Sequence, residues 1–160
     1  MRDFALNVFA ELKSAYGQEF KARHGLDSKT GVALDCAVIK LLKAHWTTSP
    51  HSIIRNSNGV FFSVWLDETK PIRPLLRYNV HAKKFRAAGY PKIAARKFAE
   101  KFRETAQDKL KSWPAISYPK GPGTLFVGHI PYEAKTLRED TLGFMRAFTA
   151  IAPFIDDLLQ

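Results

Sequence analysis

Residues 60 to 66 of this 160-residue chain, Val-Phe-Phe-Ser-Val-Trp-Leu, are the stretch that decides the fold. In an extended strand, alternate side chains point to opposite faces of the sheet. The even-numbered side chains therefore share one face, while Phe61, Ser63 and Trp65 share the other. Both faces are largely apolar. This pattern predicts a central strand that is covered on both faces or that faces a pocket.

The segments around this strand predict an antiparallel sheet. Ser57-Asn58-Gly59 is typical of a tight hairpin turn and would join the central strand to a short strand at Ile53 to Asn56. A turn at Asp67 to Pro71 would lead into a third strand. Apolar periodicity and turn residues predict further strands at residues 73–81 and 124–130, and helices at residues 4–24, 34–46, 91–113 and 134–151.

The predicted order, α-α-β-β-β-α-β-α, indicates the fold class. Strands that occur in a block beside helices are typical of α+β proteins, whereas alternation would indicate a doubly wound sheet. We expect a single α+β domain over residues 1–160, with an antiparallel sheet of about four strands packed against helices. The content of 46% hydrophobic and 12% aromatic residues suffices for a folded core.

Several classes of protein are excluded by composition. The single cysteine, Cys36, permits neither an intramolecular disulfide nor a thiolate metal cage. The N-terminal residues lack the basic start and apolar run of a secretory signal, and no stretch is apolar enough to cross a bilayer. We therefore expect a cytoplasmic protein with no membrane partner. No histidine pair has metal-ligand spacing, so no metal or cofactor is assigned, and the sequence sets no oligomeric state.

Most of the net charge of +10 lies in one segment. Residues 83–120 contain eleven Lys and Arg but only three acids, which is a net charge of +8. On the predicted helix 91–113, one flank pairs its lysines with acids, whereas the other carries Lys92, Arg96 and Arg103 without acidic neighbours. Unpaired cations are available to phosphates.

This segment predicts a binding surface for nucleic acid or another polyanion, provided that the unpaired flank meets the cations of the third strand. The alternative is an ordinary solubilising surface. The residues of the predicted surface are Arg73, Arg77, Lys83, Lys84, Arg86, Lys92, Arg96 and Arg103.

A second hypothesis concerns the turn Asp67-Glu68-Thr69-Lys70. Glu68 and Lys70 at a strand end resemble the second half of the PD-(D/E)xK nuclease signature, a resemblance that implies Mg²⁺-dependent cleavage. That family also supplies an aspartate from a preceding strand, and Ile53 to Asn56 contains no acid. An antiparallel meander would place His51 at the same rim, where it could support acid-base chemistry. A solvated hairpin turn would show the same residues.

A third hypothesis places a small ligand or a protein partner beside the central strand. The side chains of Phe61 and Trp65 form an apolar second face, which leaves a pocket if helices do not cover it. A face fully packed by helices would remove this site.

Overall fold

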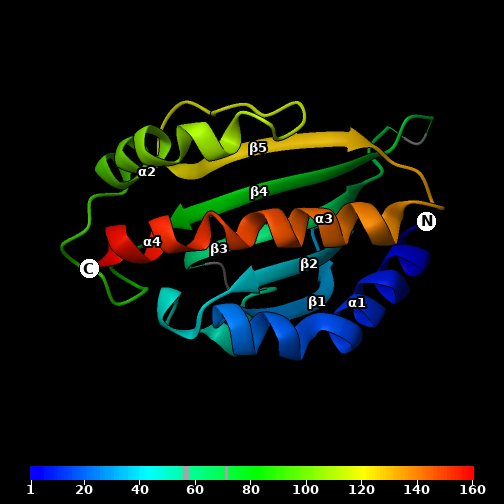
Figure 1. Ribbon diagram of the computed structural model, residues 1–160, viewed down its shortest axis with the longest axis horizontal. Coiled ribbons are helices and arrows are strands. Elements are labelled where there is room, and N and C mark those ends of the chain that lie inside the picture. The colour runs from blue at the N-terminus through cyan, green and yellow to red at the C-terminus, as the bar shows by residue number, and fades with distance from the viewer. Residues whose placement is uncertain (56–57, 71) are drawn as a thin grey trace.

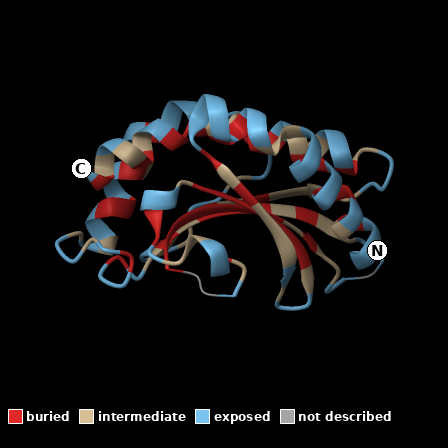
Figure 2. Ribbon diagram, turned by 90° about the horizontal axis from the view of Figure 1, so that it is seen from below, coloured by how far each residue is buried: buried red, intermediate tan, exposed pale blue. Residues whose placement is uncertain are grey.

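The structure, a computed structural model, describes residues 1–55, 58–70 and 72–160. Within these residues lies one antiparallel sheet of five strands in chain order, β1-β2-β3-β4-β5, with the helices on one of its faces (Figure 1, Figure 2). The elements in chain order are α1 (Arg2–His24), β1 (Asp27–Ala33), β2 (Cys36–Leu42), η1 (Ala44–Trp46), η2 (Pro50–Ser52), β3 (Gly59–Asp67), β4 (Leu75–Lys83), α2 (Ala95–Leu110), β5 (Gly123–Pro131), α3 (Leu137–Thr149) and α4 (Ala152–Leu159).

The predicted class is confirmed: the chain forms an α+β fold with an antiparallel sheet, which has five strands where about four were expected. The central strand at 60–66 forms as β3, and the strands at 73–81 and 124–130 form as β4 and β5. The first helix ends as expected at Gly25, whose φ of 66° is the left-handed conformation that favours glycine. No helix of the described chain is long and apolar enough to span a membrane.

The predicted helix at 34–46 is wrong, because this segment belongs to a β-hairpin. β1 and β2 pair in register from Asp27↔Leu42 to Ala33↔Cys36. Leu34 and Asp35 make the turn at φ values of 49° and 63°. From its second residue onward β2 is buried on both faces, and a strand covered on both faces has an apolar run that periodicity alone does not distinguish from a helix.

The predicted strand at Ile53 to Asn56 is also wrong for the part that the structure describes. Pro50–Ser52 form the short 3-10 helix η2 and residues 53–55 form a turn, while Asn56 and Ser57 lie outside the described residues. Asn58 is buried and makes hydrogen bonds with the side chains of Thr47 and Thr48. This pair of contacts ties the start of β3 to the segment after η1.

The remaining boundaries shift by a few residues. The helix predicted from residue 91 begins at Ala95, and the helix predicted over 134–151 forms as α3 over Leu137–Thr149. A separate short helix, α4, follows at Ala152–Leu159 and has Pro153 in its first turn. Proline is well tolerated there, since the first amide groups of a helix have no intrahelical acceptor.

One face of the sheet carries the main hydrophobic core. The ring of Phe62 on β3 stacks on Phe148 of α3 at a centroid distance of 4.5 Å. Tyr78 on β4 contacts the rings of Trp113 and Phe144 on the same side. The helices thus cover the even-numbered side chains of β3 and β4. The other face, which we call the open face, has no α-helix packed on it within the described residues (Figure 2). The turn after η2 lies against part of this face, since Ile53 O accepts a hydrogen bond from Lys40.

Candidate ligand-binding site on the open face of the sheet

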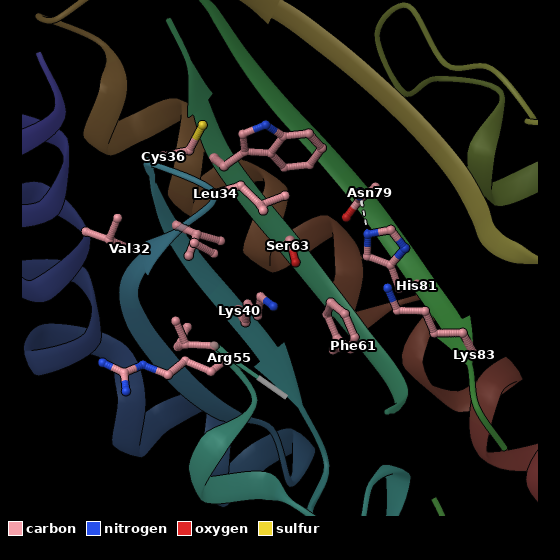
Figure 3. A pocket seen from close by; sticks show the side chains of 14 residues that line it. Val32, Leu34, Cys36, Lys40, Arg55, Phe61, Ser63, Asn79, His81 and Lys83 are labelled. Carbon is pink, nitrogen blue, oxygen red and sulfur yellow. Dashed lines mark hydrogen bonds between the residues drawn. The ribbon is translucent and has the colours of Figure 1, made fainter. Parts of the chain in front are cut away.

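The open face contains a pocket with a volume of about 520 Å³, within the usual range for small-molecule sites. Fourteen described residues line it, and they come from β1 to β4, from the turn between β1 and β2, and from the turn after η2 (Figure 3). Phe61, Trp65 and Val38 form an apolar floor. The cations Lys40, Lys83 and Arg55 also line the pocket, and none of the fourteen residues is acidic.

A row of three polar side chains crosses the pocket floor. Lys40 on β2 lies opposite Ser63 on β3, and Ser63 lies opposite Asn79 on β4. Because neighbouring strands are about 4.8 Å apart, an amine, a hydroxyl and an amide lie within roughly 10 Å of one another across the sheet. Figure 3 shows all three side chains pointing to the same side of the sheet.

Two oxygen atoms in this row have no hydrogen-bond partner among the described residues. They are Ser63 Oγ and Asn79 Oδ1, and both are buried. Buried polar atoms are almost always paired, because an unpaired one costs about 1–3 kcal/mol. Two such atoms side by side mark the floor of this pocket as a place where a bound molecule can supply the missing partners.

His81 fixes the orientation of the Asn79 amide. The Nδ1 atom of His81 lies 3.2 Å from Gly123 O, which accepts its proton, so Nε2 is left to accept from Asn79 Nδ2 at 3.0 Å. Burial, followed by the charge of Lys83, lowers the pKa of His81 to about 4. The imidazole is therefore neutral at physiological pH and holds Asn79 Oδ1 as a free acceptor.

Lys40 has an unusual environment for a lysine. Its side chain is 5% exposed, its Nζ donates to Ile53 O at 3.0 Å, and the same atom lies 4.2 Å from the centroid of the Phe61 ring. Burial and, secondarily, the charge of Lys83 lower the pKa of Lys40 to about 8. The hydrogen bond to Ile53 also holds the turn after η2 against the sheet.

The two ends of the pocket differ in electrostatic potential. Lys40 and Lys83 make one end basic. At the other end, burial raises the pKa of the Cys36 thiol, and the negative charges of Asp67, Glu68 and Asp35 raise it further. An anionic group is therefore favoured at the Lys40 end, and the Cys36 end disfavours it.

The predicted polyanion surface is divided in the structure. Arg77 is ion-paired with Asp67 at 2.5 Å on the open face. Arg103 on α2 instead donates to the backbone oxygens of Pro119, Thr124 and Leu125 at 2.9–3.0 Å, which anchors the start of β5 and the loop before it. Because α2 lies on the helix side of the sheet, the structure does not bring Arg103 together with Arg77 (Figure 1).

The other predicted cations fall into two places. Arg73 precedes the start of β4, while a second group follows its end, about 27 Å away along a strand of this length. This second group, the basic segment, contains Lys84, Arg86, Lys92 and Arg96, all of them exposed. Lys83 belongs to the pocket.

The residues of the nuclease hypothesis do not form a common rim. His51 lies in η2, in the connection that leads to the start of β3, whereas Glu68 and Lys70 follow the end of β3. The meander that would have joined them is absent because residues 53–55 are a turn. Glu68 lies 3.9 Å from the amino group of Met1. No group of three His, Cys, Asp or Glu side chains that could hold a metal occurs within residues 1–55, 58–70 and 72–160.

Fold and site together define this chain as an α+β domain with an open-faced antiparallel sheet and a basic, aromatic pocket on that face. Comparisons with family models, with curated proteins and with solved structures found no match to the chain.

Sequence reasoning predicted the pocket beside Phe61 and Trp65 but missed its polar residues. Lys40 fell in the segment predicted as a helix, and Asn79 was one of several polar residues on the predicted third strand. A signal was present in Ser63, a lone polar residue inside an apolar strand. Such a residue is either unsatisfied or faces a site.

Proposed function

We propose that this domain binds a small organic anion with an apolar body in the pocket on the open face. The observation that carries this proposal is that one cavity contains the cations Lys40 and Lys83 together with Ser63 and Asn79, whose buried oxygens have no partner among the described residues. This is the ligand-binding hypothesis of the sequence, with its chemistry made specific.

The charge of the ligand follows from the lining. Lys40 and Lys83 have no ion-pair partner within the described part of the chain, and the pocket brings no carboxylate of its own. A carboxylate or phosphate placed between them gains charge-assisted hydrogen bonds of about 1.5–3 kcal/mol each.

The body of the ligand is set by the floor. Phe61 and Trp65 present aromatic surface to the cavity, and Val38 and Ile54 extend it. Aromatic rings bury large areas and favour stacking or edge contacts with another ring. We therefore expect an aryl or branched alkyl group toward Trp65, with the anionic group toward Lys83.

The test uses tryptophan fluorescence, since Trp65 lines the pocket while Trp46 and Trp113 are buried in the main core. The protein is titrated with 3-phenylpropionate and, separately, with its neutral amide. We expect the carboxylate to bind at least about tenfold more tightly than the amide. A Trp65→Phe variant should lose the signal.

Two variants with the same change in charge provide the matched control. Lys83→Met removes a pocket cation, and Lys84→Met removes its exposed neighbour. We expect about tenfold weaker binding of the carboxylate for the first and less than about twofold for the second. Equal affinity for acid and amide, or equal effects of both substitutions, would refute the proposal.

Nucleic-acid binding is the second candidate, supported by the basic segment alone. None of its four cations takes part in an ion pair with a described residue. If they contact phosphates, the slope of log K against log salt on duplex DNA is about −0.9 per contact. A labelled oligonucleotide titrated at several salt concentrations tests this, and an affinity unchanged by Arg86→Met and Arg96→Met together would rule the segment out.

A further inference from the structure

Lys40 is the one charged side chain that is buried in the described chain. Its amine lies on the pocket floor beside Phe61, and Figure 3 shows it directed into the cavity. An ordinary structural lysine keeps its ammonium group in water or beside a carboxylate. Among the described residues no carboxylate pairs with the Lys40 amine, whose contacts there are one backbone oxygen and the face of one ring.

The environment of this amine increases its neutral fraction. With a pKa of about 8, about a quarter of the Lys40 side chains are neutral at pH 7.5, against about 0.1% for an ordinary lysine. A desolvated lysine beside another cation is the arrangement that makes an amine a nucleophile toward carbonyl carbon. Lys83 supplies the neighbouring charge.

We propose that Lys40 forms an imine with the carbonyl carbon of a small oxo acid bound in the pocket. This inference rests on the proposed function, because the carboxylate of the oxo acid occupies the anion position near Lys83. It adds a covalent step and a chemical class of ligand. The observation that carries it is the row Lys40, Ser63 and Asn79 on the floor of one cavity.

The step balances without any further reactant. The lone pair of neutral Lys40 Nζ attacks the carbonyl carbon, and the carbonyl π electrons move to oxygen. Transfer of a proton from nitrogen to that oxygen gives a carbinolamine. Loss of the hydroxyl and of the second nitrogen proton as water forms the C=N bond. No electron is gained or lost, and hydrolysis reverses the step.

The two unpartnered oxygens suit this sequence of species. Ser63 Oγ–H is a donor for the carbonyl oxygen as charge develops on it, and Asn79 Oδ1 is an acceptor for the carbinolamine hydroxyl. The ligand oxygen accepts a hydrogen bond as the carbonyl and donates one as the carbinolamine hydroxyl. The donor Ser63 and the acceptor Asn79 together meet both needs. The flexible side chain of Lys40 gives these oxygens access to the ligand when it turns toward the carbonyl carbon.

The experiment traps the imine by reduction. The intact protein is incubated with phenylpyruvate at pH 7.5, sodium borohydride is added, and the adduct is located by peptide mass spectrometry. We expect one adduct, on Lys40, in at least about tenfold excess over any other lysine. Adduct formation should rise with pH to a midpoint near 8, where an ordinary lysine would give a midpoint above 10.

Lys40→Arg keeps the charge and removes the nucleophile. It should abolish the adduct with phenylpyruvate. The wild-type protein should bind phenyllactate, the corresponding hydroxy acid without a ketone carbonyl, and give no adduct after reduction. Lys84→Arg, on the surface, should leave the adduct unchanged. Circular dichroism of each variant confirms that it is folded.

The outcomes separate this inference from the proposed function. If phenyllactate binds in the pocket and phenylpyruvate leaves no reduced adduct on Lys40, the imine is refuted and the anion site stands. If neither acid binds, both proposals fall. Adducts spread evenly over surface lysines also refute the imine.

Discussion

Replacing Ser63 with alanine should make the free protein more stable and its ligand binding weaker. Ser63 Oγ is buried and has no hydrogen-bond partner among the residues that the structure describes, so the folded state bears the cost of removing this hydroxyl from water. That cost is about 1–3 kcal/mol for a buried unsatisfied group. Alanine removes the polar atom and leaves a gap smaller than a methyl group, a loss of about 0.5–1 kcal/mol.

The net effect of Ser63→Ala is therefore a gain of about 1 kcal/mol in the free energy of unfolding. For a domain of this size such a gain raises Tm by about 2–4 °C. Binding should change in the opposite direction, because the ligand loses a hydrogen bond to the pocket floor. If that bond involves a charged group, the affinity for 3-phenylpropionate falls by about tenfold.

A second buried hydroxyl provides the control. Thr141 Oγ1 on α3 is also buried and has no partner in the described part of the chain, but it lies on the helix side of the sheet and does not line the pocket. Thr141→Val keeps the shape of the side chain and removes the hydroxyl. It should raise stability to a similar degree and leave ligand affinity unchanged.

Urea denaturation measures the stability of both variants, and fluorescence titration measures their affinity. A loss of stability in Ser63→Ala would show that the hydroxyl is satisfied in the free protein, which would remove the main support for a site at this position. A stability gain with unchanged affinity would show that the ligand does not reach Ser63.

Three further predictions concern the framework around the pocket. Gly59→Ala should destabilise the protein by more than about 3 kcal/mol, because φ is 80° at this position and a Cβ atom would overlap the backbone oxygen of Trp46. Gly121→Ala, at a φ of 87° but with nothing nearby, should cost about 1–2 kcal/mol, and urea denaturation compares the two. Arg103→Met should cost about 2–3 kcal/mol because three backbone oxygens lose a charged donor, whereas Arg96→Met should leave the urea midpoint unchanged; similar midpoints for the two would contradict the anchoring role. The pKa of Asp67 is lowered to about 2, mainly by the hydrogen bond from the Thr69 hydroxyl and to a lesser extent by the Arg77 guanidinium. The ionised Asp67 carboxylate therefore stabilises the fold above about pH 4, and this contribution is lost as the pH falls from about 4 to about 2. Acid titration of wild-type protein and Asp67→Asn should therefore show a stability difference that shrinks over this range, and a constant difference would refute it.

The parts of the fold predicted from sequence are those governed by local pattern. β3 combines alternation with β-branched and aromatic residues, and α1 ends at a glycine in the required conformation. β2 was mistaken for a helix because burial on both faces removes the polar positions that would reveal a period of two. The apolar spacing from Leu34 to Leu42 fits a helix as well as a buried strand.

The site was harder to predict than the fold, because its residues are brought together by the register in which the strands pair. Lys40, Ser63 and Asn79 lie on three different strands, far apart in the sequence, and only strand pairing brings them into a row. A pocket beside Phe61 and Trp65 followed from a local pattern, the apolar second face of β3. Arg103 was predicted to face solvent because its acceptors, backbone oxygens at the start of β5 and in the loop before it, are not visible in a helix wheel.

The chain order of the sheet has a consequence for synthesis. All five strands leave the ribosome before α3, yet it is α3 that supplies Phe148 to stack on Phe62 at the centre of the sheet. A nascent chain therefore carries a row of bare aromatic side chains until residues 137–159 emerge, and such surfaces attract chaperones and other unfinished chains. We expect ribosome-associated chaperones to bind the nascent chain when translation is stalled before α3. When translation is stalled well beyond α4, the chaperones should dissociate from the chain.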